Sequence, residues 1–206
     1  MAREEGAPRS MSPKQQRGAV TVERVLDAAL DLYASEGEAG VTVSALTRAS
    51  GVSTGSLYHH FGNLHGVISA LALRWLGRLL GELATALTSH QDARSGIEAV
   101  VRAYLEFVRT RPAAARLLHS PFADQEGAAR AAEIRDNQEA RLTPIEHWLD
   151  GHREAGELAD LPTPVIEALV LGPVVGMARR WLTLGDVDLE EAARTLPDRI
   201  WRSVGP

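Results

Sequence analysis

Apolar residues recur every three or four positions along most of this 206-residue chain, the spacing that gives an α-helix one buried face. The pattern predicts nine helices and contains no convincing strand, which indicates an all-α fold. Glycine and proline mark most of the boundaries, because glycine closes helix ends and proline starts or breaks helices. We place the helices at about residues 19–35, 43–50, 54–61, 64–89, 92–110, 112–119, 123–151, 162–183 and 188–204, the last with a possible interruption at Pro197.

The predicted helices divide into a short first domain, residues 19–63, and a larger second domain, residues 64–206. Residues 1–18 precede them and combine Gly, Pro, Ser and Gln with Arg3, Arg9, Lys14 and Arg17. This composition predicts a flexible basic arm, which is either an ordinary disordered terminus or a non-specific tether to DNA.

The first domain contains two short helices joined by a tight turn, within residues 42–65. Thr42 and Ser53 are placed to cap the two helices, and Gly51 is placed to end the first. Three groups should face inward: Val43, Leu46 and Ala49 on the first helix, Val52 at the corner, and Leu57 and Phe61 on the second helix.

The second of these helices then turns small polar groups outward, as a helix that enters the major groove of DNA requires. These groups are Thr54, Gly55, Ser56, Tyr58 and His59. No Asp or Glu occurs between Glu38 and Glu82, although the whole chain has a formal net charge of -5. An acid-free surface on an acidic protein indicates a side that can approach DNA, while the alternative is a solvated helix pair that happens to lack acids.

Three segments resemble the N-terminal domain of TetR-family transcriptional regulators: VLDAALDLYASEG, VTVSALTRASGVS and GSLYHHF. The resemblance implies a helix-turn-helix DNA-binding domain followed by a helical domain for effector binding and dimerisation. It implies DNA contacts from Thr42, Ser44, Arg48, Ser53, Thr54, Gly55, Ser56, Tyr58, His59 and His60. The chain departs from the family's pattern at Thr47, where alanine is usual, and at Leu64, where a phosphate-binding lysine is usual.

The last two predicted helices have the pattern of an interface. Gly172 and Gly176 lie four residues apart, so a second helix could approach closely, and Pro173 between them should kink the helix. The alternative is an ordinary intramolecular core. The resemblance implies a homodimer built from four such helices, which would space two recognition helices about 34 Å apart on a (pseudo)palindromic operator. The candidate interface residues are Leu169, Gly172, Gly176, Arg180, Leu196 and Ile200.

The larger domain is also expected to hold a small-molecule effector in a pocket formed by the fifth to eighth predicted helices of the chain. The candidate lining residues are Tyr104, Phe107, Trp148, Met177 and Trp181, with Arg111 and His119 as polar contacts. Each of these could equally be ordinary core, since aromatic residues at helical spacing usually pack. We expect an apolar or aromatic effector, with or without an anionic group.

Other classes of protein find little support. The chain has no cysteine, which excludes disulfides and thiolate metal sites. His59, His60 and His65 cluster without a carboxylate, so we expect neither a metal nor any cofactor. No signal peptide, membrane span or catalytic motif is visible. The sequence therefore predicts a cytoplasmic, homodimeric repressor without enzymatic activity, and the alternative is a helical enzyme or ligand carrier on the same fold.

Overall fold

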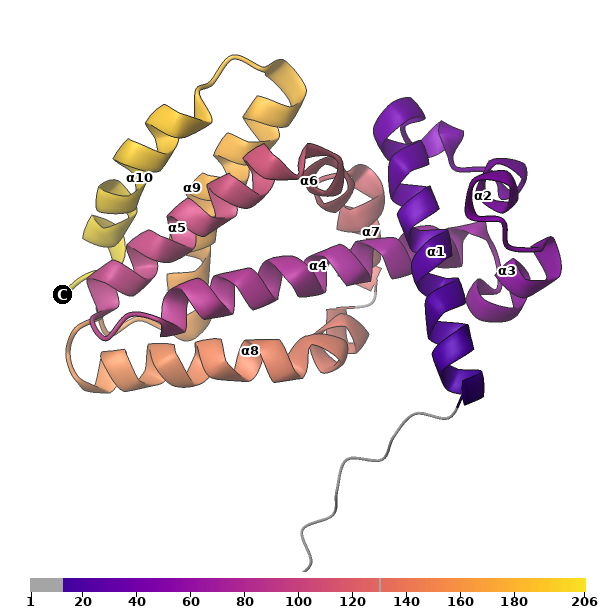
Figure 1. Ribbon diagram of the computed structural model, residues 1–206. Coiled ribbons are helices and arrows are strands. Elements are labelled where there is room, and N and C mark those ends of the chain that lie inside the picture. Colours follow the sequence, from indigo (N-terminus) through magenta and orange to yellow (C-terminus); the bar gives the residue numbers. More distant parts are fainter. Residues whose placement is uncertain (1–12, 130) are drawn as a thin grey trace, which may run out of the picture. The chain divides into compact units, whose positions relative to one another are not determined.

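The computed structural model describes residues 13–129 and 131–206. Within them the chain forms ten α-helices and one short 3-10 helix and no strand, which confirms the predicted all-α fold (Figure 1). The helices are α1 (Pro13–Glu36), α2 (Val43–Ser50), α3 (Thr54–Phe61), α4 (Leu64–Thr88), α5 (Ala93–Thr110), α6 (Pro112–Leu118), α7 (Pro121–Ala129), α8 (Ala131–Glu154), α9 (Thr163–Leu184) and α10 (Leu189–Val204), with the 3-10 helix η1 (Glu38–Gly40) between α1 and α2.

The chain divides into two compact units, and the division falls between Leu71 and Ala72, inside α4. The sequence placed this boundary at residues 63/64, where α4 begins, because a helix start is the visible signal. The first two turns of α4 belong to the N-terminal unit, so the boundary of the unit and the boundary of the helix do not coincide.

In the N-terminal unit, α1 packs against α2 and η1. The inner face of α1 contributes Val25, Leu26 and Ala29, which are all buried. The core also takes in Val41, Leu46, Val52 and Leu57, so each short helix and the corner between them contributes a buried side chain.

The start of α1 differs from the sequence expectation. The helix begins at Pro13, so residues 13–18, assigned to a flexible arm, are helical, whereas residues 1–12 lie outside the described residues. The composition of residues 1–18 suggested a flexible arm, but Pro13 suits the first position of a helix, because proline has the required φ and needs no N–H partner there.

In the C-terminal unit, α5, α9 and α10 pack against one another, and α5 also contacts α6 (Figure 1). Asp92 caps α5, which buries nine of its eighteen residues. Its buried face includes Ile97, Val100, Val101, Tyr104, Leu105 and Val108.

Two proline residues behave differently from expectation. The single helix expected at 123–151 is instead α7 and α8, and Pro121 begins α7 rather than only ending α6. The hydroxyl of Ser120 accepts a hydrogen bond from Ala123 N at 3.2 Å, which caps the new helix. In α10 the helix continues through buried Pro197 without a break.

Candidate DNA-binding surface, dimer face and ligand cavities

The turn between α2 and α3 is fixed by capping groups at both helices. Thr42 Oγ1 accepts from Ala45 N and Ser53 Oγ accepts from Ser56 N, both at 3.2 Å. Gly51 takes the left-handed conformation at φ 66°, where a side chain would be strained. Each cap stabilises its helix by about 1 kcal/mol, which is important for helices of only two turns.

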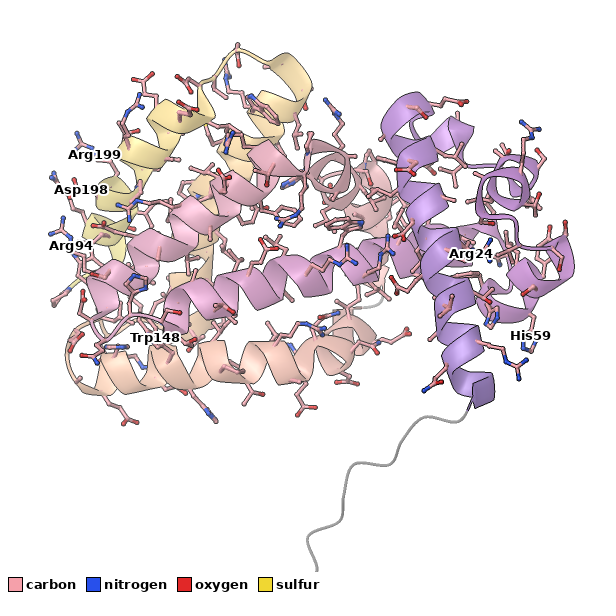
Figure 2. The ribbon with its side chains drawn as sticks, in the orientation of Figure 1. Arg24, His59, Arg94, Trp148, Asp198 and Arg199 are labelled. Carbon is pink, nitrogen blue, oxygen red and sulfur yellow. The ribbon has the colours of Figure 1, made fainter. Side chains whose placement is uncertain are left out.

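Ser50, and not Ala49, completes the inner face of α2. Ala49 is exposed, which corrects the predicted apolar face, whereas Ser50 is 5% exposed. The Ser50 hydroxyl donates to Leu46 O at 2.6 Å and accepts from Val52 N at 3.2 Å. The Arg24 Nη2 of α1 donates to Ser50 O at 2.7 Å (Figure 2). The hydrophobic pattern of the sequence does not indicate that Ser50 is buried, because serine is polar and its hydroxyl is buried only through hydrogen bonds within the protein.

The residues predicted to contact DNA gather on the outer side of α2, α3 and their turn. All ten are exposed except Ser56, which is half-buried. Tyr58 is 46% exposed although it is aromatic, and His59 points away from the body of α3 (Figure 2). The hydroxyls of Thr42 and Ser53 are occupied as helix caps, so these two residues hold the helices in place.

The basic side of α1 was missed because its first turns were assigned to the arm. Arg17 and Arg24 line a shallow surface hollow together with Gln16, Val20 and Thr21. A Cβ atom placed on Gly18 would lie 3.6 Å from His60 Cε1, so this end of α1 runs beside the end of α3. The Ser12–Pro13 pair in the sequence, a cap residue followed by proline, is the signal that could have located this helix start.

The histidines of α3 contact each other and not a shared centre. The His59 and His60 rings meet edge to face with centroids 5.1 Å apart. In the described part of the chain, no group of three or more His, Cys, Asp or Glu residues is arranged to hold a metal ion. Nor does any described helix have the length and apolar character needed to cross a membrane.

The predicted interface residues of α9 form an open face of the protomer. Gly172 and Gly176 are exposed, and a Cβ atom on either would meet nothing within 4 Å. Leu169 is half-buried, and exposed Arg180 is paired with Asp186. On α10, Leu196 is half-buried, but Ile200 is 3% exposed. Ile200 is therefore part of the protomer's own core, which corrects its assignment to a dimer interface.

Two cavities lie in the C-terminal unit. The first has a volume of about 250 Å³ and is bounded by α4, α5, α8 and α9. Its lining is Leu80, Leu83, Leu87, Ile97, Val100, Leu142, Ile145, Leu149, Ile166, Glu167, Val170 and Leu171. The second, of about 440 Å³, is lined in part by Tyr104, Glu126 and Arg135 and shares Leu142 with the first.

Most of the aromatic residues nominated for a ligand pocket are packing groups instead. Of the seven nominated residues, Tyr104 alone lines either cavity. Phe107 is 1% exposed, and its ring meets the Trp75 ring edge to face with the centroids 6.2 Å apart. The Arg111 Cζ lies over the Phe107 ring, 5.2 Å from its centroid. The Trp148 ring packs at a tilt against the His152 ring, with the ring centroids 4.1 Å apart. Met177 and Trp181 are half-buried on α9. Large rings fill space, so the cavities are left where branched aliphatic residues face one another.

Tyr104 and His119 form a polar pair beside the second cavity. Tyr104 Oη and His119 Nε2 are hydrogen-bonded at 3.1 Å. Burial raises the pKa of Tyr104 to about 12. Burial, aided by the nearby Arg179 charge, lowers the pKa of His119 to about 4. Arg179 is held by Asp124 through a 2.6 Å ion pair. Both members of the pair are therefore neutral at pH 7.

Comparison with known proteins finds relatives of both the N-terminal unit and the whole fold. Residues 25–71 match the model for bacterial regulatory proteins of the tetR family. The chain is 27% identical over 180 residues to the HTH-type transcriptional repressor KstR2 of Rhodococcus jostii, covering 87% of this chain and 76% of that protein.

Two solved structures share the fold at low sequence identity. A TetR family transcription regulator from Marinobacter aquaeolei VT8 has a TM-score of 0.70 at 19% identity, covering 93% of this chain and 98% of the other. The regulator FadR of Bacillus subtilis, solved in complex with stearoyl-CoA, has a TM-score of 0.65 at 16% identity, covering 86% and 96%. Residues 25–71 therefore match the N-terminal domain of bacterial regulatory proteins of the tetR family, and the chain shares the fold of TetR family transcription regulators.

Proposed function

We propose that this protein is a homodimeric repressor that binds a (pseudo)palindromic operator and releases it when a small molecule occupies its C-terminal unit. The observation that carries the proposal is the outer face of α3, where Thr54, Tyr58 and His59 are exposed. This helix lies within a stretch of sequence, residues 39–81, that contains no Asp or Glu. We assign it to the cytoplasm and expect no catalytic activity.

Sequence recognition is assigned to Thr54 and Tyr58. These residues are four positions apart on α3, so their side chains lie on the same side of the helix, and a hydroxyl can both donate to and accept from a base edge. Leu64, where a phosphate-binding lysine would be usual, is half-buried. Exposed Arg48 on α2 and Arg17 on α1 are the cations that we assign to the phosphates instead.

Dimerisation is assigned to the open face of α9. Gly172 and Gly176 leave room for a second helix to approach, and exposed Val165 and Leu184 lie near the two ends of the same helix. A two-fold axis here would present the same face twice and place two copies of α3 on successive major grooves, about 34 Å apart.

Effector release is assigned to the cavities of the C-terminal unit. The relative KstR2 is a repressor, and FadR was solved with stearoyl-CoA, so both repression and ligand binding occur in proteins similar to this one. We propose that a ligand binds more tightly to a conformation in which the two recognition helices no longer match the operator. Operator affinity then falls by as much as this difference in ligand affinity allows.

The test is the effect of Tyr58→Phe on binding to a DNA sequence first selected by the wild-type protein from a random pool. Loss of one hydroxyl contact should weaken operator binding by about 1 kcal/mol, roughly fivefold, as measured by fluorescence anisotropy. Because Tyr58 is exposed, the thermal melting temperature should not change.

Thr85→Val is the matched control, since this exposed hydroxyl of α4 bonds only its own helix, at Gly81 O. It should leave operator affinity unchanged. A protein that enriches no sequence from the pool would contradict the proposed function. A Tyr58 variant with wild-type affinity would contradict the assigned contact.

A further inference from the structure

The first cavity of the C-terminal unit contains one polar side chain in an otherwise apolar lining. Eleven of its twelve lining residues are leucine, isoleucine or valine, and the twelfth is Glu167 on α9. These side chains come from four helices, so the cavity is a structured site within one unit and not a surface irregularity. Such a lining, with a single polar group that can fix orientation, is typical of a small-molecule site.

Glu167 is held in this cavity without a partner that would neutralise it. It is half-buried and makes no hydrogen bond or ion pair among the described residues. The cation that lowers the pKa of Glu167, Arg135 of α8, is itself paired with Glu146 at 3.3 Å, and Glu146 raises the pKa of Glu167. Burial is the main cause of a raised pKa at Glu167, so its carboxylate is poorly solvated.

The cavity volume limits the size of a ligand. A cavity of about 150 Å³ accommodates benzene, so 250 Å³ leaves room for roughly ten non-hydrogen atoms. We infer that this cavity binds an apolar molecule of about that size carrying one hydrogen-bond-donating group, a hydroxyl or an amine, which is received by the Glu167 carboxylate. The inference rests on the proposed function, in which this molecule is the effector.

The same geometry disfavours an anionic effector, which the sequence left open. A ligand carboxylate beside Glu167 would place two like charges in an apolar site, and both could not remain ionised without a large cost. A purely apolar ligand would cover Glu167 without supplying a donor, which leaves a buried acceptor unsatisfied. An alcohol or amine avoids both costs.

The experiment is calorimetric titration of the purified full-length chain, without DNA, with octan-1-ol, octylamine and sodium octanoate. These probes share one alkyl chain and differ in the end group. Octan-1-ol and octylamine should bind, and octanoate should bind at least about tenfold more weakly, a difference of about 1.4 kcal/mol. In Glu167→Gln, which can also donate a hydrogen bond, octanoate should come within about threefold of octan-1-ol.

The matched control is Glu139→Gln, which removes one exposed carboxylate from α8 outside the cavity lining. It should keep the full discrimination against octanoate, so that a general effect of net charge is distinguished from contact with Glu167. A second variant, Leu171→Trp, places a large ring in the lining and should weaken all three probes at least tenfold while the protein stays folded.

Three results would overturn the inference: no binding of octan-1-ol and octylamine, octanoate binding as tightly as the alcohol, or unchanged discrimination in Glu167→Gln. Release of the selected operator DNA is measured separately. Discrimination that depends on Glu167 without any effect on DNA binding would support the cavity chemistry and contradict its role in regulation. Failure to select any DNA would contradict the proposed function and leave the titration result standing.

Discussion

Replacement of His119 tests whether the polar pair of the C-terminal unit is neutral and built into the fold. His119 accepts or donates one hydrogen bond with Tyr104 at 3.1 Å and faces the Arg179–Asp124 ion pair. Its pKa is lowered to about 4 by burial first and by Arg179 second, while Asp124 acts in the opposite direction. His119→Gln keeps a polar group that can bond Tyr104 but removes the titration.

The direction and size of the change in stability with pH follow from the linkage between protonation and folding. Below pH 6.5 the unfolded chain gains a proton at His119, whereas the folded protein remains neutral there until about pH 4. The contribution of this group to stability is therefore fully present above pH 6.5 and is lost as the pH falls toward 4. The gap between these pKa values corresponds to about 3 kcal/mol, and the partial exposure of the ring reduces the expected loss to about 2 kcal/mol.

The assay is urea unfolding of wild type and His119→Gln at several pH values from 7 to 4.5. Other histidines and the carboxylates titrate in both proteins, so only the difference between the two curves reports on His119. Wild type should lose about 2 kcal/mol more than the variant over this range. Parallel curves would refute the assignment, and so would an NMR titration in which the His119 ring titrates near its ordinary pKa.

Two further predictions concern glycines. A Cβ atom on Gly96 would lie 2.4 Å from Trp148 Cζ2, so Gly96→Ala should lower the free energy of unfolding, measured in urea, by about 1 to 3 kcal/mol. A Cβ atom on Gly81 would meet nothing within 4 Å, so Gly81→Ala should raise the free energy of unfolding by about 0.5 to 1 kcal/mol. Gly176→Leu should shift the proposed dimer toward monomer in light scattering, whereas Gly151→Leu, at an exposed position of α8, should not. A fully dimeric Gly176 variant would contradict the proposed α9 interface.

The helix-turn-helix could be predicted almost to the residue because its signals are local. The caps at Thr42 and Ser53 and the left-handed Gly51 each bond a backbone group only three or four residues away, and all three are confirmed. The start of α1 was missed by six residues because the composition of residues 1–18 was interpreted as a flexible arm. The error at Ala49 has another cause, since Ser50 is buried through hydrogen bonds that come partly from a distant helix.

The positions of the cavities could not be predicted from the sequence, because a cavity is the space that side chains leave unfilled. Aromatic residues at helical spacing drew attention to Phe107 and Trp148, yet Phe107 lies in the core against Trp75 and the half-buried Trp148 packs against His152. The cavity is instead lined by ordinary leucines from four helices, which carry no distinguishing pattern. Glu167 was visible in the sequence as one acid in an apolar run, but its position in a cavity depends on how α8 and α9 pack.

The buried hydroxyl of Ser50 has a consequence for the motions of the recognition helix. The Val52 N–H lies in a turn, where amides normally exchange their protons with water within a brief opening of the loop. Here its acceptor is Ser50 Oγ, which is itself anchored to Leu46 O within α2. The turn amide is thereby shielded together with the helix before it. Solvent should reach it only when the end of α2 unwinds, so α2 and the entry to α3 open and close as a single cooperative segment.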